Sequence, residues 1–105
     1  MGSFRSISRP ADFKAAFVEG RRSGDRGLTV YVRQTGERGT RLGLVVRAPS
    51  SVLRNRIKRR LREAVRAAGP EDGVDVVVRA DARVAREGFQ EMVDTIRRAM
   101  RGTPA

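Results

Sequence analysis

The chain has 105 residues, a length typical of one small domain. Its net charge is +11, and Lys14 and Lys58 are its only lysines, so 21 of its 23 basic residues are arginines. It contains no cysteine and no histidine, which excludes disulfides, thiolate zinc sites and catalysis by a cysteine or an imidazole. The arginine guanidinium can donate two hydrogen bonds to one phosphate group and can stack on nucleic-acid bases. This charge therefore indicates a polyanionic partner, most simply a nucleic acid.

The N-terminal part of the sequence predicts one helix between two irregular stretches. Residues 1–7 are rich in serine and arginine, and we expect a flexible segment there. Ser8 as N-cap and Pro10 in the first turn predict a helix that ends near Gly20. The glycines of residues 20–27 predict a turn-rich connection after this helix.

Two strands are predicted next. Residues 28–34 alternate in character, which indicates a strand with one face in the core and one open face. The core face comprises Leu28, Val30 and Val32. The open face comprises Thr29, Tyr31 and Arg33. Residues 41–47 predict the second strand, which follows a hairpin-like connection and ends before Pro49.

The C-terminal half predicts two helices around a buried strand. Residues 52–68 form an amphipathic pattern that stops at Gly69. Residues 74–79 are an almost unbroken apolar run, typical of a strand covered on both faces, and residues 84–101 predict the last helix. The order helix, strand, strand, helix, strand, helix, with one more strand possible before the second helix, predicts a single α+β domain over residues 1–105. Its expected form is an α/β sandwich with a small mixed sheet.

The densest charge lies in the helix predicted for residues 52–68. Seven of the thirteen residues in 54–66 are basic, and Glu63 is the only acid among them. Wound at about 100° per residue, the helix gathers its apolar side chains on an arc of about 120°: Leu53, Ile57, Leu61, Ala64, Val65 and Ala68. The candidate nucleic-acid-binding residues are Arg54, Asn55, Arg56, Lys58, Arg59, Arg60 and Arg62.

Two other interpretations of this charge are weaker. A solvated helix face usually mixes both signs of charge to form ion pairs four residues apart. A helix that lies on an anionic membrane usually inserts large aromatic residues and leucines from its apolar side. The excess of one sign, without such residues, favours a face that binds nucleic acid.

Aromatic residues give a second signal. Tyr31 and Arg33 share the predicted open strand face, and an aromatic ring beside an arginine is a platform for unpaired bases. Phe13 and Phe17 lie one helical turn apart in the first helix. They either form the wall of the same groove or pack in the core, and the sequence leaves both interpretations open.

Carboxylates are the remaining option for catalysis. The densest group comprises Glu71, Asp72, Asp75 and Asp81. A two-metal nuclease needs several carboxylates that converge on paired ions, whereas the first two of these lie in a predicted turn. Asp75 begins a strand and is placed to counter nearby arginines. We therefore expect neither a catalytic residue nor an intrinsic metal site in this chain.

The run Arg54 to Glu63, RNRIKRRLRE, resembles the RNR signature of the bacterial ribonuclease P protein subunit. The similarity extends in order from about Ser8 to Arg101. The other matching positions are Asp12, Phe13, Phe17 and Gly20 in the first helix, Tyr31 in the first strand, Arg41–Leu44 in the second and Asp75–Arg79 in the third. Residues 47–51 depart from the pattern, because the family's Ser-Lys-Lys-x-Gly segment is longer and more charged.

The resemblance implies a left-handed crossover through the second helix and a role in removing the 5′ leader of precursor tRNA. A catalytic RNA would perform the hydrolysis with Mg²⁺ that is bound mainly by the RNA. The signature helix would contact this RNA, and a leader-binding cleft would comprise Phe13, Phe17, Tyr31 and Arg33. The implied partners are the catalytic RNA and precursor tRNA, in the cytoplasm, with no membrane and no obligatory protein partner. The rival hypotheses are a generic RNA-binding or ribosome-associated structural protein and a protein-only nuclease.

Overall fold

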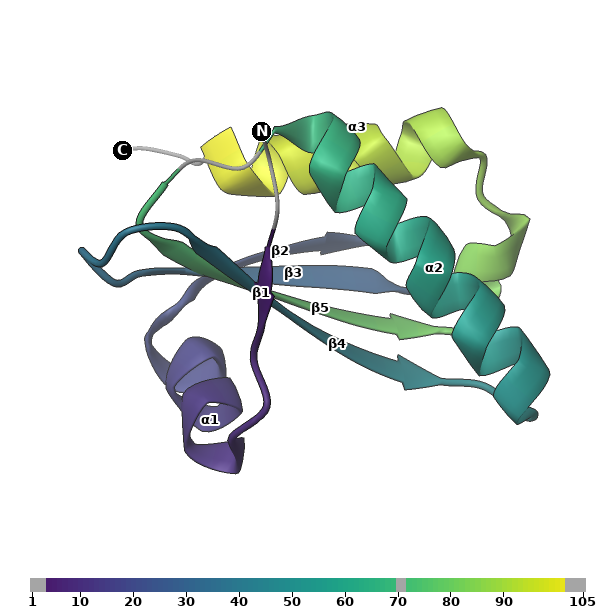
Figure 1. Cartoon of the computed structure of the whole chain (residues 1–105). Helices are drawn as coiled ribbons and strands as arrows, with labels where there is room; N and C mark the ends of the chain where they lie inside the picture. The colour runs from purple at the N-terminus through teal and green to yellow at the C-terminus, as the bar shows by residue number, and fades with distance from the viewer. Residues whose placement is uncertain (1–3, 70–71, 102–105) are drawn as a thin grey trace.

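Five strands form one mixed sheet, and helices cover both of its faces (Figure 1). The computed structural model describes residues 4–69 and 72–101. Its elements are β1 (Arg5–Ser6), α1 (Pro10–Glu19), β2 (Arg21–Asp25), β3 (Leu28–Gln34), β4 (Thr40–Arg47), α2 (Ser51–Ala68), β5 (Val74–Asp81), the 3-10 helix η1 (Ala82–Arg86) and α3 (Phe89–Arg101). The strand order is β1-β4-β5-β3-β2. This architecture confirms the predicted α+β fold with a mixed sheet.

Strand β5 lies at the centre of the sheet and separates two apolar cores. It runs parallel to β4 and antiparallel to β3, and Val74–Val78 are all buried. Val76 and Val78 belong to the larger core beneath α2 and α3, whereas Val77 belongs to a smaller core beneath α1. The prediction of a strand covered on both faces is confirmed. The hairpin-like connection is not, because β5 lies between β3 and β4 and keeps them from pairing.

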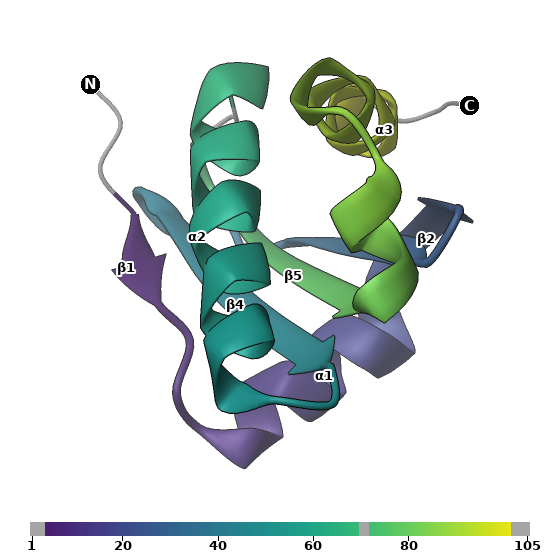
Figure 2. The same ribbon diagram turned by 90° about the vertical axis from the view of Figure 1, so that its right-hand side faces the viewer.

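The connection from β4 through α2 to β5 is left-handed. In Figure 2 the strands β4 and β5 run toward the viewer, α2 lies on the upper side of the sheet, and β5 lies to the right of β4. A chain that rises from β4 into α2 and descends to the right makes a left-handed turn, against the strong general preference for right-handed crossovers. The hand implied by the family resemblance is therefore confirmed.

Local sequence sets both ends of α2. Ser50 is the N-cap, and its Oγ accepts a hydrogen bond from the main-chain N–H of Leu53 at 3.1 Å. Gly69 follows the last turn with a φ of 73°, a left-handed conformation in which a side chain is strained. The predicted stop at Gly69 is confirmed, and Pro70 lies outside the described residues.

Strand β2 occupies most of the segment that the sequence predicted to be a turn-rich connection. All five of its residues are exposed, and it pairs with β3 at one edge of the sheet. A strand held by its backbone at an edge needs no apolar alternation, and Gly24 within β2 together with Gly20 and Gly27 on either side of it indicated a turn instead. The turn itself is short, with positive φ angles at Arg26 and Gly27.

The prediction of a flexible segment over residues 1–7 is wrong for its second half. Arg5 and Ser6 form β1, which pairs in parallel with β4, and Ile7 is buried in the smaller core. A two-residue strand is too short to produce a periodic pattern, which explains why the sequence did not predict it. Residues 1–3 lie outside the described residues.

Two predicted helix boundaries also need correction. Helix α1 has Arg9 as its N-cap, without a side-chain hydrogen bond, instead of Ser8. The helix predicted for residues 84–101 is two elements, η1 and α3, because the chain is extended before α3. There the carboxylate of Glu91 accepts a hydrogen bond from the main-chain N–H of Gly88 at 2.8 Å and so caps the start of α3.

We predict that Ser50→Ala lowers the free energy of unfolding by about 1 kcal/mol, because the N–H of Leu53 loses its acceptor. Chemical denaturation followed by circular dichroism measures the change. Ser51→Ala is the matched control, since Ser51 is the first residue inside the helix, and it should change stability by less than about 0.5 kcal/mol. Equal effects of the two substitutions would contradict this account of the cap.

Candidate nucleic-acid interface

Helix α2 packs one face on the sheet and presents a basic face to solvent. Its buried residues are Ile57, Leu61, Ala64 and Val65, and Leu53 and Ala68 are partly buried. This confirms the apolar arc predicted from the sequence. Among the residues predicted to bind nucleic acid, Asn55, Arg56, Arg59 and Arg62 are exposed. No helix in residues 4–69 or 72–101 combines the length and apolar character that a membrane span requires.

Four cations of this face have no partner within the described part of the chain. The side chains of Arg56, Lys58, Arg59 and Arg62 make neither an ion pair nor a hydrogen bond with residues 4–69 or 72–101. They lie close to one another on one helix, so their mutual repulsion destabilises the free protein. A polyanion on this face would relieve that repulsion.

Arg54 and Arg60, also predicted to bind nucleic acid, contact the protein itself. Arg54 donates a hydrogen bond to the carbonyl oxygen of Ala48 at 3.4 Å, and Arg60 donates one to the carbonyl oxygen of Glu87 at 2.9 Å. Arg60 thereby ties α2 to the connection between η1 and α3. Each guanidinium has five N–H donors, so both side chains keep donors that these contacts do not use.

Tyr31 does not lie on an open sheet face. The side chain points away from the larger core, as predicted, but it is only 6% exposed. Helix α1 covers this part of the sheet, and the Phe17 ring packs edge-on against Tyr31 with ring centroids 4.9 Å apart. The prediction of Tyr31 as an open platform for bases is therefore wrong.

Phe13 and Phe17 pack on the core, which is one of the two roles that the sequence left open, and neither lines the cleft that contains Tyr31. Both rings are half-buried against the smaller core. Phe13 packs so closely on Gly43 that a Cβ at this glycine would lie 2.6 Å from the ring. The guanidinium of Arg79 lies over the Phe17 ring, 5.6 Å from its centroid. Phe17 therefore lies between the smaller core and the guanidinium of Arg79.

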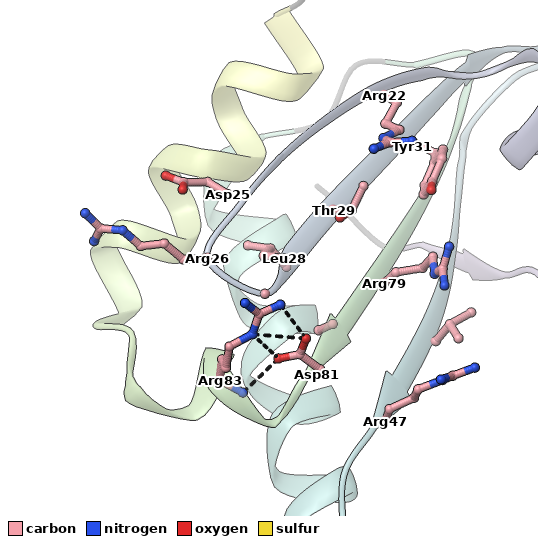
Figure 3. A pocket seen from close by; sticks show the side chains of 13 residues that line it. Arg22, Asp25, Arg26, Leu28, Thr29, Tyr31, Arg47, Arg79, Asp81 and Arg83 are labelled. Carbon is pink, nitrogen blue, oxygen red and sulfur yellow. Dashed lines mark hydrogen bonds and ion pairs between the residues drawn. The ribbon is translucent and has the colours of Figure 1, made fainter.

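Beyond Phe17, the same face of the sheet is open. A cleft of about 490 Å³ lies over β2, β3, β4 and β5. Figure 3 shows Tyr31, Arg79 and Arg47 following one another along it, with Leu28 on the other side of β3. We name this hollow the sheet cleft. Its basic residues are Arg22, Arg26, Arg47, Arg79 and Arg83.

Sequence reasoning missed the cations of the sheet cleft, although part of the signal was present. In β5 the side-chain alternation places Arg79 on the same face as Asp75 and Val77. By the same rule, Arg47 lies on the same face of β4 as Gly43. Arg22 could not be found in this way, because β2 itself was not predicted.

Two cations of the sheet cleft form ion pairs within the protein, Arg26 with Glu87 at 3.6 Å and Arg83 with Asp81. Arg83 donates to both carboxylate oxygens of Asp81, with the shortest distance, from Nη2 to Oδ2, at 2.8 Å (Figure 3). This hydrogen-bonded guanidinium lowers the pKa of Asp81 below its ordinary value. Arg22, Arg47 and Arg79 form no ion pair with the described residues, so the cleft retains an excess of positive charge.

Arg33, predicted to line the leader cleft, lies elsewhere. It does not line the sheet cleft, and its Nε donates to the carboxylate of Glu19 at the end of α1 at 2.8 Å. Its Nη1 lies 3.5 Å from a carboxylate oxygen of Asp75. The hydrogen bond with Glu19 is the main cause that raises the pKa of Arg33. The structure therefore brings Arg33 into an ion network instead of joining it to Tyr31 in a cleft.

Asp75 is the centre of that network. Its side chain is 1% exposed, and Arg41 donates to its two oxygens from Nε at 2.9 Å and from Nη2 at 2.7 Å. Arg41 also reaches Asp12 near the start of α1, at 3.2 Å. The hydrogen bond with Asp75 is the main cause that raises the pKa of Arg41. The prediction that Asp75 counters nearby arginines is confirmed.

Within the described part of the chain, the acidic residues that the sequence groups together do not converge on a cation site. Asp75 and Asp81 are bound by arginines, and Asp72 accepts a hydrogen bond from the main-chain N–H of Gly39 at 2.6 Å. Glu71 lies outside the described residues. No group of three carboxylates that could hold a metal ion occurs within residues 4–69 and 72–101. Asp75 and Asp81 do not fit a protein-bound Mg²⁺, because both oxygens of each carboxylate already accept hydrogen bonds from an arginine.

Comparison with known proteins gives the family. The sequence model described as Ribonuclease P matches residues 1–103. The chain belongs to the ribonuclease P protein family. The ribonuclease P protein component of Streptococcus mutans is 39% identical over 89 residues, which cover 82% of this chain and 71% of that protein. The component of Streptococcus pneumoniae is 37% identical over 90 residues, which cover 82% and 73%.

Solved ribonuclease P proteins have the same fold. The protein of Staphylococcus aureus superposes with a TM-score of 0.76 at 23% identity, over 94% of each chain. The protein of Thermotoga maritima superposes with a TM-score of 0.67 at 25% identity, over 88% of this chain and 91% of that one. The family resemblance drawn from the RNR signature is confirmed. The chain is thus of the kind that forms the protein component of a ribonucleoprotein nuclease in tRNA processing.

In this ribonuclease P family member, we predict that Asp75→Asn lowers the free energy of unfolding by about 3 kcal/mol. The substitution removes the carboxylate and leaves Arg41 without its main partner in a part-buried site. Urea denaturation measures the loss. Asp94→Asn is the matched control, because the carboxylate of Asp94 makes only exposed contacts, a hydrogen bond from Gln90 at 3.0 Å and a long pair with Arg97 at 3.7 Å. Exposed pairs of this kind are worth less than about 1 kcal/mol. A loss at position 75 as small as that of the control would contradict the network's role.

Proposed function

We propose that this chain binds the catalytic RNA of ribonuclease P through α2 and the single-stranded 5′ leader of precursor tRNA in the sheet cleft. It thereby assists the Mg²⁺-dependent removal of the leader. The observation that carries the proposal is the row of cations on α2 that have no partner within the described chain, in a protein of this family.

The exposed face of α2 suits a folded RNA. Arg56 and Arg59 lie three residues apart and point to solvent, and they can each neutralise a phosphate of one RNA helix. Asn55 lies beside them and offers an amide to a phosphate or a 2′-hydroxyl. The apolar arc holds the helix rigidly on the sheet, so these groups are in place before RNA arrives.

The sheet cleft suits a single strand. Phe17 and Arg79 form a stacked pair at its edge, and Arg47 and Arg22 supply charge along it. Stacking and phosphate contacts of this kind tolerate many base sequences, as a protein that handles the leaders of many tRNAs requires. The side chains that do this work are therefore Phe17, Arg79, Arg47 and Arg22, with Tyr31 as support beneath Phe17.

The two surfaces lie on opposite faces of the sheet. Helix α2 covers one face, and the sheet cleft opens on the face that carries α1 (Figures 1 and 2). One molecule can therefore hold the catalytic RNA and the leader at the same time without either competing for the other's cations. In this arrangement the protein holds the leader beside the RNA subunit.

We propose that the RNA supplies the hydrolytic groups and binds the Mg²⁺. This part of the proposal is supported by Asp72, Asp75 and Asp81, whose carboxylates accept hydrogen bonds from a main-chain amide or from arginines. The chain's own contribution is to neutralise phosphates and to orient the leader. The cytoplasm, where bacterial precursor tRNA is processed, is the compartment that this function implies.

We predict that the double substitution Arg56→Ala with Arg59→Ala weakens binding to the catalytic RNA and reduces the log–log salt slope by about 1.4 to 1.8, or about 0.7 to 0.9 per lost phosphate contact. The fold should persist, because both side chains are exposed. Filter binding over a salt series measures the affinity. Cleavage of precursor tRNA at low Mg²⁺, with and without each protein, measures the consequence.

The matched control for this prediction is Arg98→Ala with Arg101→Ala, which removes the same charge from exposed positions on α3. It should leave the affinity for the catalytic RNA nearly unchanged at moderate salt. If the α2 and α3 double variants bind the RNA equally well, α2 is not the RNA-binding surface. Cleavage by the purified protein without any RNA would overturn the assignment of hydrolysis to the RNA.

We predict that Arg79→Ala weakens binding of precursor tRNA that carries a leader, because it removes a cation and the cover of the Phe17 ring. The expected loss is about 1–3 kcal/mol of binding free energy, with affinity for mature tRNA and for the catalytic RNA unchanged. Fluorescence titration of the holoenzyme measures it. Arg38→Ala, in the exposed β3–β4 connection, is the control of equal charge. Tyr31→Ala is unsuitable, because Tyr31 is buried in the smaller core.

A further inference from the structure

A second hollow lies between β1 and α2, away from the sheet cleft. It has a volume of about 290 Å³, close to the lower end of the range for small-ligand sites, about 300–1,000 Å³. Figure 2 shows β1 and α2 side by side, with β4 behind them. We name this hollow the edge groove. Residues that carry the argument are Phe4, Ser6, Leu44, Lys58, Arg62 and Arg66.

The edge groove exists because β1 is short. β1 pairs only with Arg41 and Leu42 of β4, and the last main-chain hydrogen bond runs from the N–H of Ile7 to the carbonyl oxygen of Leu42 at 3.0 Å. After Ile7 the chain leaves for α1. On the side away from β5, β4 from Gly43 onward therefore has no neighbouring strand among residues 4–69 and 72–101, and the space beside it is bounded by α2.

The inner side of the edge groove is apolar. Leu44 lines it and is half-buried against the larger core. At Gly43 the groove is closed by the ring of Phe13 and the Cβ of Ile7. A Cβ added to this glycine would lie 2.6 Å from the Phe13 ring and 3.3 Å from the Cβ of Ile7. Phe4 lines the groove from β1's side. A flat, apolar group would be desolvated there on several sides.

The outer side is cationic. Lys58, Arg62 and Arg66 are spaced four residues apart and form one stripe of α2, about 6 Å between successive positions along the axis. Arg66 is engaged, because it pairs with Glu63 at 2.6 Å and lies over the Phe4 ring at 5.6 Å. Lys58 and Arg62 have no such partner among the described residues.

The charge of the edge groove selects the class of ligand. Four of its eleven lining residues are basic and none is acidic. An apolar inner side next to unpaired cations matches the two halves of a nucleotide, the base and its phosphate. The small volume admits one nucleotide and excludes a nucleic-acid helix.

We propose that the edge groove holds one unstacked nucleotide of the catalytic RNA, with its base against Leu44 and Phe4 and its phosphate on Lys58 and Arg62. This inference rests on the proposed function, because it requires α2 to face that RNA. It adds that the RNA must present a single extruded nucleotide beside the helix. The free energy of binding then includes base burial as well as phosphate contacts.

Ser6→Trp tests the edge groove by filling it. Ser6 is exposed and lines the groove from β1, and an aromatic residue suits a strand. We expect about tenfold weaker binding of the catalytic RNA by the full-length protein, with an unchanged salt slope because no charge is removed. Ser23→Trp, at an exposed position of the opposite edge strand β2, is the matched control and should bind as the parent protein does.

Photo-crosslinking identifies the source of the nucleotide. The photoreactive residue p-benzoyl-phenylalanine is placed at position 6, and in a control at position 23, in the holoenzyme with precursor tRNA bound. We expect a crosslink to the catalytic RNA from position 6 only. A crosslink to precursor tRNA alone, or none to RNA, would overturn the proposal.

The outcomes separate this inference from the proposed function. If Ser6→Trp binds normally while the Arg56 and Arg59 double variant binds weakly, the edge groove holds no nucleotide but α2 still binds RNA. If neither variant changes affinity, the proposed function fails as well. Circular dichroism checks the fold of Ser6→Trp. Should that variant not fold, Phe4→Ala, which removes the aromatic wall, decides by the same affinity measurement.

Discussion

The bidentate pair between Arg41 and the buried Asp75 is the interaction on which the geometry of the rest depends. Asp75 lies in the central strand, Arg41 comes from β4 and Arg33 from β3, so one carboxylate joins three strands. The same arginines reach Asp12 and Glu19, near the two ends of α1. A buried ion pair of this kind adds little net stability when intact but is costly to break. Its effect here is positional, because it sets α1 on the sheet and with it the Phe17 ring that lies beneath the guanidinium of Arg79.

The carboxylates of this network are paired with only a few arginines, which explains why many other arginines are available to bind a ligand. The carboxylates that fix the fold are matched to particular guanidiniums: Asp75 to Arg41 and Glu19 to Arg33. The exposed face of α2 and the sheet cleft receive few of them. The arginines therefore fall into two groups. Those of the first group are paired with acids and hold the domain together, and those of the second group give two opposite surfaces an excess of positive charge. Both surfaces are rigid, since α2 is anchored by its apolar arc and the cleft floor is the sheet.

Elements with strong local signals were predictable, and those that depend on distant partners were not. The ends of α2 follow from Ser50 and Gly69, and its apolar arc from helical spacing. Strands β1 and β2 were missed because edge strands need only backbone partners, which sequence periodicity does not report. Tyr31 was placed on the correct face but given the wrong exposure, since its burial depends on where α1 packs. The placement of Arg33 was mispredicted for the same reason, because its partners Glu19 and Asp75 come from other elements. The RNR signature gave the family, while the cations of the sheet cleft required the strand register.

The central position of β5 affects how the protein folds during its synthesis. Strands β3 and β4 are neighbours in the chain, yet they cannot pair until residues 74–81 are inserted between them. During synthesis on the ribosome, the first seventy or so residues therefore expose strand edges and apolar side chains with no native partner. Such a topology, rich in long-range contacts, folds late and risks association with other chains before it does. The positive charge of the arginine-rich nascent chain counteracts this association, because two incomplete copies repel each other.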